Sequence, residues 1–402
     1  MHAHEFRPLA DTEFRPARDL FMRALNLPPV TDEMWQSVSR TSEPGRVFGG
    51  FLDGELAGTA LTGTSALAVP GGAEVPAGAV TGVGVRADRT RRGVLTGLMR
   101  AQFDDARERG EPVTMLHASE AVIYERFGYG VATRSRTVSL DRFRAALRPD
   151  APRGGRIDLL EPEAARTVLP DVYRGLGLVR PGSIVRGDAW WDMNLAVAPR
   201  DAVAVVHYDP AGVPDGFLRY EPKSRDHRFD DGTVTLQVRD LVAGDAIAAA
   251  ELWRFLFERD LTDRIVAVDR PLDEPVEWLM VDRRACRTTA VGDDLWVRLV
   301  DVAAALRART FNAAEPVLVE VHDRFLPDNE GTYRIGPEEV ERTEQRPQLS
   351  MDVSALAALY LGDVSVSALA AAGRVQVHEP AALPGADHLF TTDVVPWCGT
   401  PF

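Results

Sequence analysis

The chain has 402 residues and a formal charge of −14, and the whole negative excess lies after residue 150, because the first 150 residues hold 19 basic and 19 acidic side chains. An acidic chain without a basic block argues against nucleic acid or an anionic membrane as partner and is compatible with a cationic one; acidity for solubility alone is an equal alternative. The length predicts two or three domains. Two distant cysteines and the lack of an apolar leader predict a cytoplasmic protein without a disulfide framework or zinc site.

Alternating helices and strands are predicted along the first 130 residues. The expected elements are, in chain order, a helix over 11–25, a helix after Thr31, a hairpin around Asp53-Gly54, a strand over 79–85, a helix over 93–110, a strand over 113–117 and a short helix over 121–127. Asp11 and Thr31 are suitable helix caps, and the Asp-Gly pair is typical of a tight hairpin turn. Strand, Arg-rich loop, helix and strand therefore follow one another from residue 79 onwards.

A second region repeats this order of elements. Strands are expected at 202–207, 216–220 and 234–243, and a long amphipathic helix follows, but nothing like the Arg-rich loop recurs. We therefore predict a degenerate copy of the first region, with Trp190 and Trp191 packed beneath it.

A third region of strands and Ala-rich helices begins near Leu295. Its Glu-rich stretch over 336–347 is expected to be a solvated loop.

The strongest local signal is VTGVGVRADRTRRGVLTGLM, residues 80–99. A strand ends, successive backbone N–H groups pass through Arg91, Arg92 and Gly93, and a helix begins. Such a turn at a helix N-terminus binds a pyrophosphate through aligned donors and the helix dipole, while the glycine allows close approach and the arginines add charge. A merely solvated Arg-rich loop is the simpler alternative for this segment taken alone.

Together with ASEAVIYERFGYG at 118–130, this loop resembles the coenzyme A pyrophosphate loop of GNAT acyltransferases. The IYERFGYG motif, the chain length and the aromatic last residue further resemble the Eis (enhanced intracellular survival) N-acetyltransferases. The resemblance implies an α+β fold of mixed α/β type, with tandem GNAT-like domains on mixed central sheets and a sterol-carrier-protein-like C-terminal domain. The expected boundaries are 1–145 for the catalytic domain, 146–290 for its degenerate copy and 291–402 for the C-terminal domain.

The resemblance also implies acetyl-CoA as cosubstrate and no metal. The residues that it assigns to the coenzyme are Val83, Val85, Arg91, Arg92, Gly93 and Ser119. Val83 and Val85 would offer backbone groups to the pantetheine arm, and Ser119 would lie near the acetyl group. Thr90 stands where the family usually has Arg or Gln, three positions before Gly93, which keeps the backbone contact and puts the side-chain contact in doubt.

Two residues match the family's acid and base. Tyr124 matches the phenol that protonates the leaving thiolate, whereas a tyrosine in an apolar helix would otherwise be read as core packing. Phe402 matches the family's last residue, whose carboxylate accepts the amine's proton, and a carboxylate with a pKa of about 3.5 is ionised at neutral pH. The apolar, proline-rich ending DVVPWCGTPF predicts an anchored tail, although most termini are frayed.

The substrate-side matches are mixed. Asn26, Trp35 and His117 fall at positions that resemble the family's aminoglycoside pocket, although core packing explains Trp35 and His117 equally well. Asn26 and Pro401 stand where the family can present acidic residues, which weakens the expectation of a polycationic acceptor.

The sequence thus predicts an N-acetyltransferase that transfers acetyl directly from acetyl-CoA to the amines of a cationic small molecule, an aminoglycoside above all. The partner expectations are a small-molecule amine, no nucleic acid, no membrane and a homohexamer built as a dimer of trimers, the last from the resemblance alone. Polyamines or protein lysines are alternative acceptors. A lipid- or small-molecule-binding protein with a vestigial acetyltransferase site is the alternative from another class.

Overall fold

The structure is a computed structural model that describes residues 4–196, 201–224, 234–313 and 315–402. It divides into two compact units, which are described separately. The first consists of Met1–Thr133, Arg180–Met193 and Asp294–Phe402, and the second of Arg134–Val179 and Asn194–Asp293. None of the helices in the described ranges combines the length and the apolar character that crossing a membrane requires.

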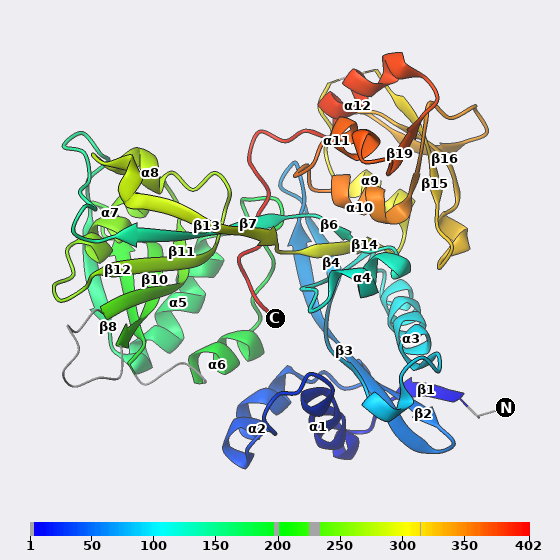
Figure 1. Ribbon diagram of the computed structural model, residues 1–402, viewed down its shortest axis with the longest axis horizontal. Helices are drawn as coiled ribbons and strands as arrows, with labels where there is room; N and C mark the ends of the chain where they lie inside the picture. Colours follow the sequence, from blue (N-terminus) through cyan, green and yellow to red (C-terminus); the bar gives the residue numbers. More distant parts are fainter. Residues whose placement is uncertain (1–3, 197–200, 225–233, 314) are drawn as a thin grey trace. The chain divides into compact units, whose positions relative to one another are not determined.

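The first unit contains a seven-stranded mixed sheet in the order β1-β2-β3-β4-β5-β14-β6 (Figure 1). Its strands are β1 (His4–Pro8), β2 (Val47–Leu52), β3 (Glu55–Ala68), β4 (Glu74–Val85), β5 (Val113–Leu116), β6 (Gly130–Val131) and β14 (Trp296–Leu299). Only β4 and β5 run parallel, and α3 (Val94–Glu108) connects them. The predicted hairpin is confirmed, because Asp53 and Gly54 both have positive φ angles between β2 and β3.

One of the two helix caps predicted for this region from the sequence is present in the structure. The other helices of this sheet's region are α1 (Phe14–Ala24), α2 (Asp32–Val38), α4 (Ala121–Tyr124) and α6 (Asp188–Ala196). Thr31 caps α2 as predicted, with its hydroxyl accepting the Met34 N–H at 3.2 Å. The predicted cap at Asp11 is wrong, because a 3-10 turn precedes α1 and the Glu13 carboxylate accepts the Ala10 N–H at 2.9 Å.

Strand β4 separates from β5 over its C-terminal half. The two strands pair only at Ala77–Ala79 of β4. On the β3 side, Gly82 and Val83 together lie opposite the single residue Ala60, which makes a β-bulge. The backbone groups of residues 80–85 that face β5 are therefore not used by the sheet.

The second unit repeats the strand order of the first, as predicted. Its order is β8-β9-β10-β11-β12-β7-β13, so that β7 occupies the place that β14 has in the first sheet. The strands are β7 (Arg134–Asp141), β8 (Arg156–Leu160), β9 (Val203–Tyr208), β10 (Pro214–Ser224), β11 (Val234–Ala243), β12 (Arg264–Arg270) and β13 (Cys286–Asp293). The helices are α5 (Pro162–Leu176), α7 (Ala246–Phe257) and α8 (Val276–Leu279). Its core surrounds Trp253, which is fully buried.

A five-stranded sheet in the order β17-β16-β15-β18-β19 completes the first unit. Its strands are β15 (Val317–His322), β16 (Gly331–Ile335), β17 (Val340–Thr343), β18 (Leu349–Asp352) and β19 (Val375–Val377), and its helices are α9 (Val302–Ala308), α10 (Val353–Leu359), α11 (Val366–Ala371) and α12 (Leu383–Phe390). The loop predicted over 336–347 is wrong in part, because β17 forms there. Figure 1 shows α10 lying beside β14, and one apolar core is continuous from β5 and β14 to this sheet.

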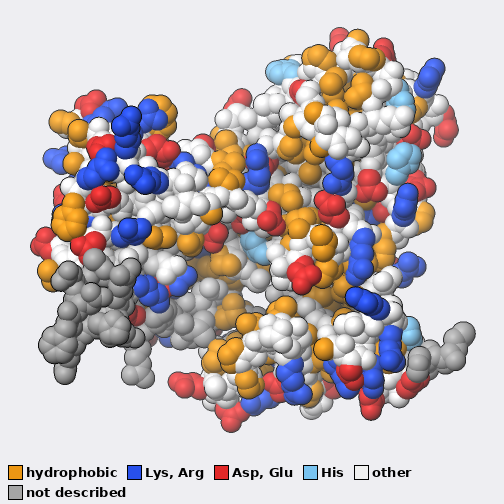
Figure 2. Space-filling view, in the orientation of Figure 1, with side chains coloured by type: hydrophobic (Ala, Val, Ile, Leu, Met, Phe, Trp, Pro, Cys, Tyr) orange, Lys and Arg blue, Asp and Glu red, His pale blue; other side chains and the backbone are white. Residues whose placement is uncertain are grey.

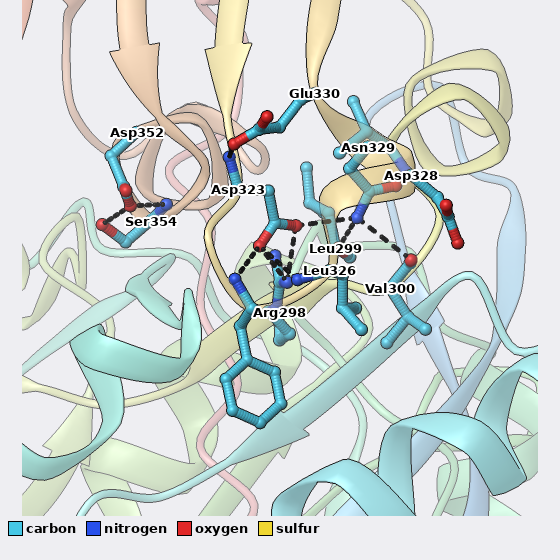
Figure 3. Close-up of polar contacts among 12 residues, drawn as sticks. Arg298, Leu299, Val300, Asp323, Leu326, Asp328, Asn329, Glu330, Asp352 and Ser354 are labelled. Atoms are coloured by element: carbon cyan, nitrogen blue, oxygen red, sulfur yellow. Dashed lines mark hydrogen bonds and ion pairs between the residues drawn. The ribbon is translucent and has the colours of Figure 1, made fainter.

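A buried ion pair joins the two sheets of the first unit (Figure 3). Arg298 of β14 donates to both carboxylate oxygens of Asp323 at 2.8 and 2.6 Å, and both side chains are almost fully buried. Asn329 donates to the same carboxylate at 2.8 Å and to the Val300 carbonyl at 3.2 Å. Removing either charge would leave the other buried and unpaired, which typically costs about 3–5 kcal/mol of stability.

Candidate active site

The Arg-rich loop ends at a helix N-terminus that is open to an anion. Gly93 is the N-cap of α3 with a φ of 82°, a conformation that favours glycine, and Arg91 before it also has a positive φ of 60°. No side chain caps the helix, and its first turn carries no acidic residue. The first N–H groups of α3 and the positive end of its dipole are therefore available to a phosphate group.

The arginines of this loop divide into paired and unpaired ones. Arg86 and Arg89 form ion pairs with Asp88 and Glu55. Arg91 and Arg92 are exposed, and neither forms an ion pair with any residue in the described ranges. Figure 2 shows basic side chains gathered over α3 and the loop that precedes it. The two arginines that the sequence singled out are thus the ones with a free charge for a pyrophosphate.

Val83 and Val85 lie on the part of β4 that is separated from β5. Both are half-buried, and their strand leaves backbone groups unused on the β5 side. An extended amide chain such as pantetheine can add to such a strand in the manner of a further strand. Both predicted residues therefore lie on a stretch of β4 whose β5 side is open to pairing with an extended chain.

Tyr124 is buried at the end of α4, with 7% of its surface exposed. Burial is the main reason that the pKa of its phenol is raised above 10.0; the charge of Glu120 adds to this, and a hydrogen bond with Ser119 opposes it. A phenol with a raised pKa keeps its proton at neutral pH, so Tyr124 is in the form that a proton donor needs. Ser119 lies one residue before Glu120, which is the N-cap residue of α4.

His117 follows β5 and meets the C-terminal tail. Its Nε2 lies 2.9 Å from the Thr400 carbonyl oxygen and its Nδ1 lies 2.9 Å from the Asp294 carbonyl oxygen. The rings of His117 and Phe402 contact edge to face, with their centroids 4.8 Å apart. The structure thus brings His117 and Phe402 together, as it does Ser119 and Tyr124.

No contact joins Tyr124 to Phe402 directly among the described residues. Their partners Ser119 and His117, however, are two residues apart in the chain, so the Cα atoms of these partners are within about 7 Å of each other. The acid candidate and the last residue of the chain are therefore held by one short segment after β5.

The last residues of the chain are anchored along their length. Residues 180–190, which run into the start of α6, provide four contacts at distances between 2.6 and 3.0 Å. The Trp397 N–H donates to the Pro181 carbonyl, and the side chains of Arg180, Arg186 and Trp190 donate to Val395 O, Thr400 Oγ1 and Pro401 O. Trp190 therefore holds the tail within the first unit. The predicted anchored tail is confirmed.

Asp294 is the buried centre of this anchor. Its Oδ2 accepts the backbone N–H groups of Cys398 and Gly399 at 3.1 and 3.3 Å and the Thr133 hydroxyl at 3.1 Å. Its Oδ1 lies 3.6 Å from His117 Nδ1. His117, Asp294 and Cys398 also form the one group of potential metal ligands in the described ranges. Both ring nitrogens of His117 and one carboxylate oxygen of Asp294 are engaged by protein atoms, so this set of donors fits a tail anchor better than a metal site.

A cavity of about 150 Å³ lies in the first unit and is lined in part by Phe402. Its other polar and aromatic lining residues include Arg18, Glu43, Thr64 and Trp190. Sequence reasoning did not find Arg18, Glu43 or Asp294, because each is an isolated charged residue without a local motif.

Two of the predicted substrate-binding residues, Asn26 and Trp35, lie outside the lining of this cavity. Asn26 is exposed after α1 with a φ of 55°, and Trp35 is half-buried against the apolar cluster around Phe14 and Phe51. Neither is among the residues that line the cavity.

Comparisons with known proteins agree with this architecture. Residues 5–132 and 182–299 each match an acetyltransferase (GNAT) domain, and residues 302–399 match a sterol carrier protein domain. The chain is 40% identical over 377 residues to an uncharacterized N-acetyltransferase of Streptomyces avermitilis, covering 91% of this chain and 90% of the relative.

The chain is also similar to Eis proteins of mycobacteria. The chain is 34% identical over 356 residues to N-acetyltransferase Eis of Mycobacterium bovis, covering 85% of this chain and 84% of the relative. The crystal structure of Eis1 from Mycobacterium abscessus superposes with a TM-score of 0.90 at 40% identity, over 100% of both chains. The expected fold class and enzyme class are thereby confirmed. The chain therefore belongs to the Eis family of GNAT N-acetyltransferases, in which two acetyltransferase domains precede a sterol-carrier-protein-like domain.

Proposed function

We propose that this acetyltransferase passes the acetyl group of acetyl-CoA directly to an amine in the first unit, with Tyr124 as general acid and the Phe402 carboxylate as general base. The observation that carries the proposal is the anchored tail. Asp294, Arg186 and Trp190 hold residues 398–401, so that Phe402 lies at the wall of a cavity and against His117.

Each proton in the reaction has a group to receive or supply it. The carboxylate of Phe402 attracts the ammonium form of the acceptor and takes its proton, which frees the nitrogen lone pair to attack the thioester carbonyl. The tetrahedral intermediate then breaks its C–S bond, and Tyr124 gives its proton to the leaving thiolate. The attacking nitrogen releases its second proton to solvent, and solvent returns a proton to the Tyr124 phenolate. Ser119 beside Tyr124 orients the phenol.

The coenzyme would be held by three features of the first unit. These are the backbone of β4 at Val83 and Val85, the charges of Arg91 and Arg92, and the helix N-terminus at Gly93. Direct transfer requires no acyl-enzyme, and the described cysteines support this. Burial is the main reason that the pKa of Cys286 is raised to about 12, and Cys398 is buried within the tail.

The acceptor expected from the sequence is an aminoglycoside. Among the described lining residues, Glu43 and the proposed Phe402 carboxylate are negative and Arg18 is positive, so the net charge is close to −1. This balance offers little to a polycation, so we propose an amine with few positive charges as the preferred acceptor and keep aminoglycosides, polyamines and protein lysines as the comparison panel. The proposed assembly remains a homohexamer and the proposed location the cytoplasm, which sedimentation and cell fractionation would test.

Replacing Tyr124 with phenylalanine tests the proposal. General acid catalysis contributes about 10²- to 10⁴-fold, so we expect kcat with the best acceptor of the panel to fall by this order while acetyl-CoA affinity changes little. The measurement is release of free coenzyme thiol together with titration calorimetry. Tyr208→Phe, in β9 of the second unit, is the matched control.

An unchanged kcat in Tyr124→Phe, or a loss of acetyl-CoA affinity, would contradict the proposal. Either result would show that Tyr124 has a packing role and is not the general acid. If the wild-type protein binds no acetyl-CoA at all, the alternative of a lipid- or small-molecule-binding protein with a vestigial site is favoured instead.

A further inference from the structure

Arg18 places an unused positive charge at the wall of the acceptor cavity. It lies on α1 and lines the same cavity as Phe402, Glu43 and Trp190. Its Nε is buried without a hydrogen-bond partner, and no described residue forms an ion pair with its guanidinium. The Cζ atom of Arg18 lies 5.2 Å from the centroid of the Phe21 ring.

The environment of Arg18 is unusual for an arginine. Burial lowers the pKa of its guanidinium. The neighbouring arginine on the same helix, Arg15, is by contrast paired with Asp32 at 2.5 Å. Arg18 is half-buried, and its Nε has lost water without gaining an acceptor, which is unfavourable. An anion that accepts a hydrogen bond from this Nε would remove that cost.

The acidic groups of the cavity do not satisfy Arg18. Both carboxylate oxygens of Glu43 are held by Thr64, one by its N–H and one by its hydroxyl, each at 2.6 Å. Phe402 contributes the terminal carboxylate that is proposed to receive the amine's proton. The residues that line the cavity thus carry two negative groups, those of Glu43 and of the Phe402 terminus, and one positive group, that of Arg18.

We propose that Arg18 binds an anionic group of the acceptor, so that the acceptor is a small molecule with both a primary amine and a carboxylate or phosphate. This inference rests on the proposed function. The planar guanidinium offers paired N–H donors that match a carboxylate or a phosphate group. The amine of the same molecule lies toward the carboxylates, where it can lose its proton.

The size of the cavity agrees with such an acceptor. Pockets for drug-sized ligands span about 300–1,000 Å³, whereas this cavity holds about 150 Å³. Pro401 provides no carboxylate beside the terminus, and Asn26 is not in the cavity wall. A compact amino acid or amino phosphate fits these walls better than a large polycation does.

Matched pairs of acceptors test the inference. The pairs are 4-aminobutyrate with butylamine, and O-phosphoethanolamine with ethanolamine, which differ in one anionic group and separate carboxylate from phosphate. We expect kcat/KM to be about 10- to 100-fold higher for the anionic member of at least one pair, mainly through KM, as expected for one charge-assisted contact. In Arg18→Gln this ratio falls to near one, and in Arg18→Lys it is partly restored.

Thermal stabilisation tests the same contact without turnover. We expect the preferred anionic amine to raise the Tm of the wild type more than its neutral partner does, and this difference to vanish in Arg18→Gln. Equal behaviour of both members of each pair, in kcat/KM and in Tm, would overturn the role of Arg18 while leaving acetyl transfer to amines intact. Failure to acetylate any amine in the panel would overturn the proposed function, and the Tm comparison would still decide whether Arg18 binds the anion.

A stability comparison separates binding from structure. Arg46 is 1% exposed and is bound by Glu111, Asp105 and Thr64, so Arg46→Met should lower Tm strongly. Arg18→Met should leave Tm unchanged or raise it, because an unpaired charge is removed. A fall in Tm as large as that of Arg46→Met would show that Arg18 is a structural residue and would contradict the proposal.

Discussion

The two seven-stranded sheets have the same strand order, but the helix that follows the fourth strand begins differently in each. In the first sheet, eight residues separate β4 from α3, and the N-cap is Gly93, which has no side chain to bind the first N–H groups. In the second, two residues separate β11 from α7, and the Asp245 carboxylate accepts the Ala248 N–H at 2.8 Å. Asp245 thus occupies the position at which an anion would bind.

This difference separates fold from function. Both helices have the positive end of their dipole at the N-terminus. In both sheets the strand before the helix pairs with its parallel neighbour over part of its length: β4 pairs with β5 at Ala77–Ala79, and β11 pairs with β12 at Thr235–Val238. A carboxylate cap satisfies the helix internally and repels a pyrophosphate. Coenzyme binding is therefore predicted for the first copy alone, and the second copy keeps the fold.

Giving the first helix the cap of the second is expected to have the largest effect on coenzyme binding. Gly93→Asp places a negative charge at the proposed pyrophosphate site, in a positive-φ position that Asp and Asn tolerate better than most residues. We expect the Kd for acetyl-CoA, measured by calorimetry, to rise on the order of 100-fold, since charges at close range interact by a few kcal/mol. Gly93→Asn, with the same shape and no charge, should cost about tenfold or less. Equal losses in both variants would show that charge is not the cause.

Loosening the tail should have the next largest effect. Asp294→Asn weakens the acceptor of the Cys398 and Gly399 N–H groups, so Phe402 would be held less firmly. We expect kcat to fall roughly tenfold while KM for acetyl-CoA is unchanged, because a small misplacement of a catalytic group costs this much or more. Asp293→Asn, the exposed neighbouring residue in β13, is the control. A matching loss of acetyl-CoA affinity would show that Asp294 supports the fold of the whole site.

Removing the cap of the second copy should have the smallest effect. Asp245→Ala deletes one capping hydrogen bond, which costs about 1 kcal/mol of stability, measured by chemical denaturation. Turnover and acetyl-CoA stoichiometry should not change. A second equivalent of bound acetyl-CoA in this variant would show that the cap alone had kept the second copy empty.

Local motifs were sufficient to predict much of the first sheet and the coenzyme loop. Asp53-Gly54 requires two positive φ angles in a hairpin, and Gly93 after two arginines predicts a helix start that is open to phosphate. These signals lie within a few residues, so neighbouring side chains determine the local structure.

Features that depend on distant residues could not be predicted. In β7 and β14, apolar and polar residues alternate as in many strands. No local pattern shows that β14 in the first sheet and β7 in the second occupy the same position in the strand order. The charged stretch at β17 resembles a loop because charge is common on an edge strand. Arg18 and Asp294 acquire a role only when α1, β5 and the tail meet in the folded chain.

The central claim is that a carboxylate at Phe402 is the base. Adding two glycines after Phe402 moves that carboxylate away while leaving the side chains of the tail in place. Our account predicts that kcat for the best acceptor falls by about 10²- to 10⁴-fold while calorimetry shows unchanged affinity for acetyl-CoA. Full turnover by the extended protein would contradict it.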